Sequence, residues 1–443
     1  MNRRDLLKLG GACTLLGISQ GCGSNATLPK TAVTQVDATS PWNKLLFGYQ
    51  GWFGTPRDTS ELNEWQHWSF NKPISASSIT FDIWPDVGEF KIDDLSATGL
   101  KLANGNEAYL FSSFKKQMVD THFRWMQSYG IDGVFLQEFV LNLVPGSKQR
   151  QFRDVVTENV MQAASSTGRV VAIMYDVTGA NPTQLISLIR SHIQANSHLI
   201  FSNDRYLHYN SKPLIGIWGL GFVDRNIPVG VANATLDYLE SEGIAVMGGV
   251  PTFWRQAVID SQTGPEWSAF YKRYSLLSPW TVGRYSNSLE LSRYVENTLS
   301  KDISYANSFG SEIVPVVFPG LSNHNVLRVE NPNSPPPPIN SIPRLNGNFW
   351  WNQMSKYSDL PAKSIYGAMF DEVDEGTAMF KIQNNERNLP VGLDLLSNAV
   401  SGDTVPNDWY LTLAGKATAL YKSGSPITLN FLNALLKTES LVN

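Results

Sequence analysis

The chain has 443 residues, of which 42% are hydrophobic and 17% are charged, so it can bury a large core as a globular protein. The formal net charge is only -4, and no long basic run follows the first residues, which argues against nucleic acid as a partner. Both cysteines, Cys13 and Cys22, lie near the N-terminus, so the body carries no disulfide and no thiolate metal site. We expect no cofactor.

The first residues are typical of an export leader. Two adjacent arginines, Arg3 and Arg4, precede an apolar run over residues 9–18, as in twin-arginine signal peptides. The sequence Ile18-Ser19-Gln20-Gly21-Cys22 is similar to a lipoprotein cleavage box, which predicts lipidation of Cys22. Ordinary cleavage to a soluble periplasmic protein is the alternative.

These features divide the N-terminal part of the chain into two segments. Residues 1–22 are predicted to be a signal peptide, and the small, polar residues 23–40 a flexible tether. We expect an exported monomer in the periplasm or at the outer membrane or cell surface, touching the membrane only through its lipid anchor.

From residue 41 onward, short β-rich runs alternate with helical patterns, which favours a parallel sheet. The predicted strands are 45–49, 133–138, 170–175, 214–218, 245–249, 276–280, 313–318 and 365–370. Eight such units predict one α/β domain over 41–425, a (β/α)8 TIM barrel rather than a doubly wound sheet. Residues 426–443 are left as a C-terminal tail or helix.

The clearest helix precedes the second strand. Apolar side chains recur there at helical spacing from Met118 to Tyr129, and Gly130 ends the pattern. We interpret His122 on this stripe as a packed core histidine rather than a ligand. Further helices are predicted at 151–164, 182–195, 232–242, 290–304 and 349–356.

Aromatic and polar residues follow one predicted strand after another. The C-terminal ends of barrel strands hold the active site in this fold. The first connection, residues 50–114, is long enough that we expect it to form one wall of a cleft. From both regions the candidate substrate-binding residues are Tyr49, Trp52, Trp84, Asp86, Gln137, Tyr175, Asp176, Trp218, Trp254, Trp280, Arg284, Tyr285, His324, Asp371 and Asp374. Any one of them taken alone could equally be a packing or surface residue.

The last predicted strand ends in four acids within five positions: Asp371, Glu372, Asp374 and Glu375. Crowded carboxylates repel, and one of them can relieve this by keeping its proton near neutral pH. A protonated acid beside an ionised one suits general acid/base chemistry on a glycosidic bond. A solvated acidic turn and a calcium site are the alternatives.

Five segments together resemble glycoside hydrolase family 99 and its bacterial family 71/99-like relatives. They are Gly48-Tyr49-Gln50-Gly51-Trp52-Phe53, residues 81–86, 129–135 and 278–285, and Glu372-Val373-Asp374-Glu375-Gly376. The resemblance covers residues 41–381 and implies a (β/α)8 retaining, endo-acting α-mannosidase or mannanase. It also implies two catalytic glutamates three positions apart. Glu372 would act as base on the substrate 2-hydroxyl, giving a 1,2-anhydro sugar, and Glu375 as the acid/base.

The chain departs from that family motif at two positions. Val373 and Asp374 stand where the family has Trp and His, so α-mannoside specificity does not carry over. Our leading hypothesis is an exported retaining glycoside hydrolase acting on a polysaccharide or oligosaccharide. The alternative is a cell-surface lipoprotein that binds glycans on the same fold without cleaving them, since fold does not fix function.

Overall fold

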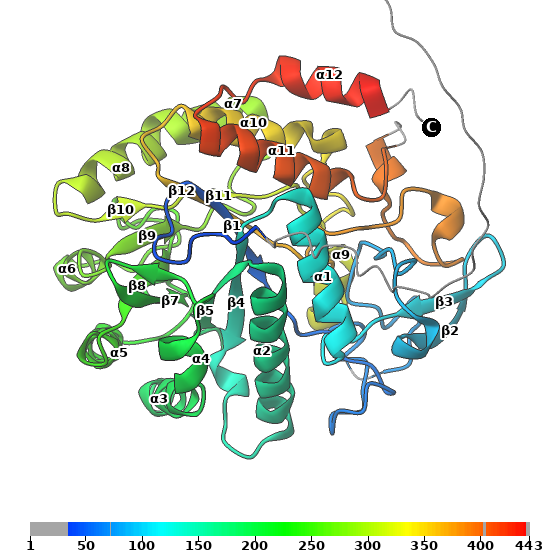
Figure 1. Ribbon diagram of the computed structural model, residues 1–443, viewed down its shortest axis with the longest axis horizontal. Coiled ribbons are helices and arrows are strands. Elements are labelled where there is room, and N and C mark those ends of the chain that lie inside the picture. Colours follow the sequence, from blue (N-terminus) through cyan, green and yellow to red (C-terminus); the bar gives the residue numbers. More distant parts are fainter. Residues whose placement is uncertain (1–33, 71, 402–404, 440–443) are drawn as a thin grey trace, which may run out of the picture. The chain divides into compact units, whose positions relative to one another are not determined.

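A parallel sheet curls around the centre of the computed structural model, which describes residues 34–70, 72–401 and 405–439 (Figure 1). The strands occur in the spatial order β10-β9-β8-β7-β5-β4-β1-β12-β11. Their bounds are β1 (Lys44–Tyr49), β4 (Gly133–Phe139), β5 (Val170–Asp176), β7 (Lys212–Trp218), β8 (Ala245–Val250), β9 (Leu276–Pro279), β10 (Glu312–Ile313), β11 (Val316–Val317) and β12 (Ser364–Gly367). The predicted leader and Cys22 lie outside the described residues.

The two ends of this order belong to one extended segment, residues 312–317, and this closes the sheet. Its first half pairs with β9 and its second half with β12. Between them, the Val314 amide donates to Leu277 O at 2.8 Å, and the Tyr366 amide donates to Pro315 O at 2.9 Å. Pro315 has no N–H to give to the ladder, which accounts for the break. The predicted (β/α)8 barrel is confirmed, with its seventh strand in two halves.

The strands form where the sequence has nearly continuous apolar runs. Every residue of β5 is buried, as expected for a parallel strand covered on both faces. All eight predicted strands are present. The last ends at Gly367 rather than at residue 370, although the Phe370 amide still donates to Gly48 O of β1 at 2.8 Å.

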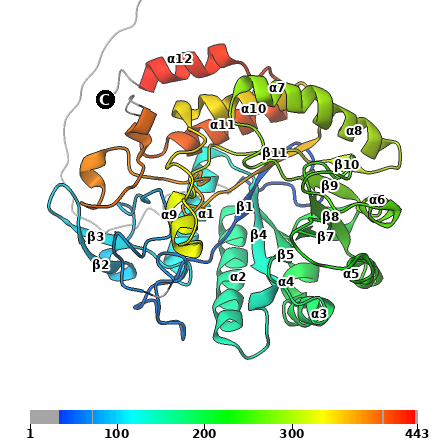
Figure 2. The same cartoon turned by 180° about the vertical axis from the view of Figure 1, so that it is seen from behind.

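Helices surround the sheet in both views (Figure 2). They are α1 (Lys116–Tyr129), α2 (Lys148–Thr167), α3 (Leu185–Ala195), α4 (Ser197–Ser202), α5 (Val229–Ser241), α6 (Pro265–Tyr271), α7 (Ser288–Tyr294), α8 (Ser300–Asn307), α9 (His324–Glu330), α10 (Asn348–Ser358), α11 (Trp409–Ser423) and α12 (Leu429–Glu439). A π-helical turn, Val295–Leu299, joins α7 to α8 where one helix is predicted. The helices α4, α6, α9 and α11 are not among the predictions.

His122 is fully buried, which confirms its interpretation as a core residue.

The long first connection folds against a distant part of the chain. It contains the hairpin of β2 (Ser96–Lys101) and β3 (Glu107–Leu110). The remaining short strand, β6 (His208–Tyr209), lies outside this connection and pairs with β7. Isolated bridges join Ile83 to Leu396, Pro85 to Ile382 and Leu102 to Pro390. The connection is therefore a second small layer beside the barrel, not a loose loop.

Both described ends of the chain belong to the packed unit. The predicted tether is packed from residue 34 onward: Val36 and Ala38 are buried, the Val36 amide donates to Gly168 O at 2.8 Å and the His208 amide donates to Ala38 O at 2.7 Å. At the other end, α12 lies on α10, where the Phe431 ring stacks on Trp351. Among the described helices, none combines the length and apolar character needed to cross a membrane.

A substitution at Gly415 of α11 can test the close contact between α11 and α1. A Cβ at this position would lie 1.9 Å from the carbonyl oxygen of Tyr129 at the end of α1. Gly→Ala in a helix ordinarily gains about 1 kcal/mol, but overpacking against backbone costs about 1–3 kcal/mol or more. We expect Gly415→Ala to lower the free energy of unfolding in denaturant titrations.

Gly230→Ala in α5 is the matched control, because a Cβ there would meet open space. It should leave stability unchanged or raise it by up to about 1 kcal/mol. Equal behaviour of the two variants would contradict the close contact of α1 with α11.

Candidate active site

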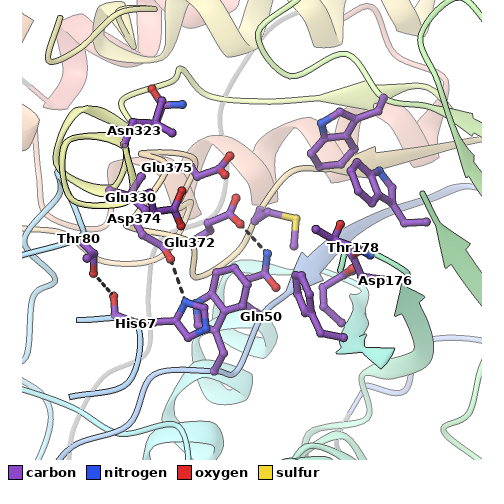
Figure 3. A pocket seen from close by; sticks show the side chains of 18 of the residues that line it. Gln50, His67, Thr80, Asp176, Thr178, Asn323, Glu330, Glu372, Asp374 and Glu375 are labelled. Carbon is purple, nitrogen blue, oxygen red and sulfur yellow. Dashed lines mark hydrogen bonds and ion pairs between the residues drawn. The ribbon is translucent and has the colours of Figure 1, made fainter. Parts of the chain in front are cut away.

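A cavity of about 420 Å³ opens at the C-terminal ends of the barrel strands (Figure 3). Residues from the strand ends, the first connection and α9 line it together. They are Gln50, Trp52, His67, Phe70, Thr80, Gln137, Phe139, Asp176, Thr178, Trp218, Arg225, Trp280, Asn323, Val326, Leu327, Glu330, Tyr366, Met369, Glu372, Asp374 and Glu375.

The four acidic side chains of the turn after β12 lie in two different environments. Glu372, Asp374 and Glu375 line the cavity. Asp371 does not: it is fully buried and accepts hydrogen bonds from the amides of Gln50 at 2.7 Å and Gly51 at 2.9 Å. Asp371 thus holds the backbone that follows β1, and it is not placed to contact a substrate.

A buried arginine holds the same piece of backbone from its other side. Arg153 of α2 donates to the carbonyl oxygens of Gln50 at 2.9 Å and Gly51 at 2.7 Å, and its Nε lies 3.0 Å from Glu138. Gly51 has a φ of +56°, a conformation that glycine adopts without the steric cost of a side chain. The Asp371 carboxylate binds the amides of this turn and the Arg153 guanidinium binds its carbonyl oxygens. Together they hold the turn in one conformation.

The fixed turn brings the Gln50 side chain to Glu372. Gln50 Nε2 donates to Glu372 Oε1 at 2.6 Å, and Thr377 Oγ1 donates to Glu372 Oε2 at 2.6 Å. Burial, followed by the charge of Glu375, raises the pKa of Glu372 well above its usual range, while the two hydrogen bonds act in the opposite direction. Both oxygens of Glu372 are therefore placed as acceptors.

Glu375 has a different environment. Its side chain is exposed to the cavity and forms no hydrogen bond with any described residue. Desolvation by the surrounding protein raises the pKa of Glu375, and the charges of Glu330 and Asp176 raise it further. Nothing around Glu375 offers a hydrogen bond to its ionised form, so this environment favours the protonated acid.

Asp374 faces an aromatic stack. The rings of Trp52 and His67 lie parallel with centroids 3.9 Å apart, and His67 Nδ1 is 3.5 Å from Asp374 Oδ2. Burial, and then the charge of Arg153, lower the pKa of His67 to about 3, while burial raises that of Asp374. His67 is therefore neutral near pH 7, and its contact with Asp374 is not an ion pair.

Six of the predicted substrate-binding residues line the cavity, together with both predicted catalytic glutamates. The six are Trp52, Gln137, Asp176, Trp218, Trp280 and Asp374. Burial raises the pKa of Asp176 to about 6, although its Oδ1 accepts a hydrogen bond from the Thr178 amide at 2.7 Å.

Two predicted residues, Tyr49 and Tyr175, point away from the cavity because side chains alternate along a strand. Their hydroxyls bond instead to the Nδ1 atoms of His122 and His192, each at 2.9 Å, between the sheet and the helices. The same alternation turns Gln50 and Asp176 inward.

Six further predicted residues also lie outside the lining, each with a structural partner. Trp84 and Trp254 are core residues. Asp86 accepts a hydrogen bond from Asn407, and Arg284 pairs with Asp260 at 2.7 Å. Tyr285 donates to Gln353 at 3.0 Å, and the His324 ring bonds to Pro337 O at 2.8 Å. None of these six side chains belongs to the lining of the cavity.

The structure adds lining residues that are not among the candidate residues, chiefly Gln50, His67, Thr80, Arg225 and Glu330. His67 and Thr80 come from the first connection, which does form a wall of the cavity. Strand alternation could have indicated Gln50, whereas nothing in the sequence marks Glu330 on the unpredicted α9. Across the described residues, no three histidine, cysteine or acidic side chains converge as a metal site requires.

Comparisons with known proteins find similar structures but no similar sequence. No protein-family model matches the chain, and no curated protein matches it in sequence. The structure is similar to that of the GH99 endo-alpha-mannosidase from Bacteroides thetaiotaomicron, with a TM-score of 0.61 and 14% identity over 88% of this chain and 99% of that chain. That protein in complex with BIS-TRIS-propane gives a TM-score of 0.59 at 14% identity, over 88% of this chain and 98% of that chain. The predicted resemblance to glycoside hydrolase family 99 is confirmed at the level of the fold.

The buried pair of Arg153 and Glu138 allows a test of the turn. Arg153→Met would leave the Glu138 carboxylate buried without its partner, so we expect the free energy of unfolding to fall by roughly 3–5 kcal/mol. Adding Glu138→Gln removes that charge and should recover part of the loss. Denaturant titration of both variants measures the difference, and no recovery in the double variant would contradict the ion pair as the cause.

Proposed function

We propose that the protein is a retaining glycoside hydrolase in which Glu372 is the base and Glu375 the acid/base. One observation carries the proposal: two glutamates three positions apart face one cavity in opposite hydrogen-bond environments. Both oxygens of Glu372 accept hydrogen bonds, which suits a proton acceptor. Glu375 has no such donors and lies open to the cavity, which suits a proton donor.

The proposed reaction uses the substrate's own 2-hydroxyl. Glu372 removes the hydroxyl proton as the oxygen attacks the anomeric carbon, while Glu375 gives its proton to the departing glycosidic oxygen. The resulting 1,2-anhydro sugar is opened by a water that the Glu375 carboxylate deprotonates, and Glu372 returns its proton to O2. Two displacements retain the configuration, and this substrate-assisted route differs from the standard two-carboxylate geometries.

Aromatic side chains in the lining support a glycan as the substrate. Trp218 and Trp280 meet edge to face with ring centroids 5.4 Å apart, and the stack of Trp52 on His67 lies in the same cavity. Flat rings beside a few polar groups are typical of pockets that fix a ligand's orientation. Asp374 is a cavity residue at a position where the family motif has His, so we propose a polysaccharide or oligosaccharide without assigning mannose.

Glutamine variants of the two glutamates test the assignment. We expect Glu372→Gln and Glu375→Gln each to lower turnover by about 100-fold or more, because each removes a proton-transfer group. Fragments released from a broad panel of glycans, α-mannans included, would be identified by mass spectrometry.

Glu242→Gln, an exposed residue after α5, is the matched control and should leave the fragments unchanged. Parent-like activity in both active-site variants would overturn the proposal. Tight glycan binding by the parent protein without any cleavage would instead support the non-catalytic glycan-binding alternative.

Thr377 provides a test that depends on pH. Thr377→Val removes the hydrogen bond to Glu372 Oε2, so the ionised form loses a donor and the pKa of Glu372 rises. A base must be ionised to act, so the acidic limb of the kcat/KM profile should move to higher pH. Thr235→Val in α5, where the hydroxyl bonds only to Val231 O, is the control. An unmoved acidic limb in Thr377→Val would argue against Glu372 as the base.

We also propose, from the leader alone, that the protein is exported and anchored through a lipid on Cys22.

A further inference from the structure

One wall of the cavity is acidic. Asp374 and Glu375 from the turn after β12 lie beside Glu330 at the end of α9, while Asp176 lies on the opposite side (Figure 3). The charge of Glu330 also reaches Glu375, where it contributes to that residue's raised pKa. We call Glu330, Asp374 and Glu375 the acidic wall.

The acidic wall is not neutralised by the protein. Within the described part of the chain, the carboxyls of Glu330 and Glu375 have no hydrogen bond or ion pair. Asp374 is only 5% exposed, yet its Oδ1 is buried with no hydrogen-bond partner. Nearby, Gln50 Oε1 is also unpartnered, while its Nε2 binds Glu372. A ligand in the cavity can supply donors to these acceptor atoms.

Positive charge is scarce in the lining, and its one guanidinium is partly paired: the Arg225 Nε has no hydrogen-bond partner among the residues that the structure describes. Arg225 is the one Lys or Arg among the described lining residues, and its guanidinium lies 2.6 Å from Asp224 and 5.1 Å from the ring centroid of Trp218. His67 is neutral, because burial lowers its pKa to about 3. Five carboxyls therefore share a cavity with one guanidinium. A concave site in which carboxyl groups outnumber positive groups concentrates cationic ligands.

We propose that Glu330 and Asp374 of the acidic wall bind the protonated amino group of an amino sugar within the substrate glycan. An ammonium carries three donors and no acceptor, which matches the unpartnered oxygens of this wall. The inference rests on the proposed hydrolase function and extends it to a substrate class. Because the proposed reaction uses a free 2-hydroxyl at the cleaved sugar, the amino sugar occupies a neighbouring position against Glu330.

Selective N-acetylation of substrate glycans tests the amino group directly. Acetic anhydride in aqueous bicarbonate caps free amines, removes their charge and leaves hydroxyls intact. Whichever glycan of the panel the parent protein cleaves, we expect N-acetylation to lower kcat/KM by about tenfold or more, the scale set by losing a partly desolvated ion pair. Cleavage that survives N-acetylation unchanged would overturn this inference alone. A panel in which nothing is cleaved or bound would overturn the proposed function, and this inference with it.

Glu330→Gln tests the wall itself, with the exposed Glu242→Gln as the matched control. The readout is the ratio of kcat/KM for the free-amine glycan to that for its N-acetylated form. We expect this ratio to fall about tenfold in Glu330→Gln and to stay at the parent value in Glu242→Gln.

A different result would assign Glu330 another role. If Glu330→Gln moves the alkaline limb of the pH profile equally for both glycans and leaves their ratio unchanged, Glu330 acts only on the proton of Glu375. That outcome overturns the amino-sugar site.

Discussion

The site depends on how the backbone at Gln50 and Gly51 is held. Its amides bind Asp371 of the turn after β12, and its carbonyls bind Arg153 of α2, which is itself neutralised by Glu138 of β4. Three strands and one helix thus meet at two peptide units. Because the Gln50 side chain binds Glu372, the position of that carboxylate follows from buried charges on the far side of the turn. Such indirect support is what holds a reactive group within a fraction of an ångström.

The four acids after β12 show how one short segment serves both structure and chemistry. Asp371 and Glu372 are adjacent, yet one binds backbone amides and the other faces the cavity. Burial raises the pKa of every acid in the group, and hydrogen bonds then distinguish them: Asp371 and Glu372 receive donors, whereas Glu375 receives none from the described residues. Burial is therefore the main cause of the raised pKa values in this group, and the hydrogen bonds determine which carboxyl oxygens are held as acceptors.

Much of the fold was predictable because strands that are buried on both faces are visible as apolar runs, and all eight were placed from the sequence. Both glutamates proposed for catalysis also line the cavity. Predictions from strand ends were less accurate where they ignored alternation, which turns Tyr49 and Tyr175 toward the helices. Trp84 and Trp254 are core residues because aromatic side chains fill interiors as readily as they line pockets. Glu330 was not predictable, because its place in the cavity depends on the path of a loop and a short helix.

The first connection has a consequence for how a ligand meets the cavity. It carries Trp52, His67 and Thr80 into the lining, and farther along the chain its bridges to residues 382–396 tie it to the segment after β12. A wall anchored at both its start and its middle has little conformational freedom to lose when the proposed glycan binds. The entropic penalty of association would then fall mainly on the flexible ligand rather than on the protein.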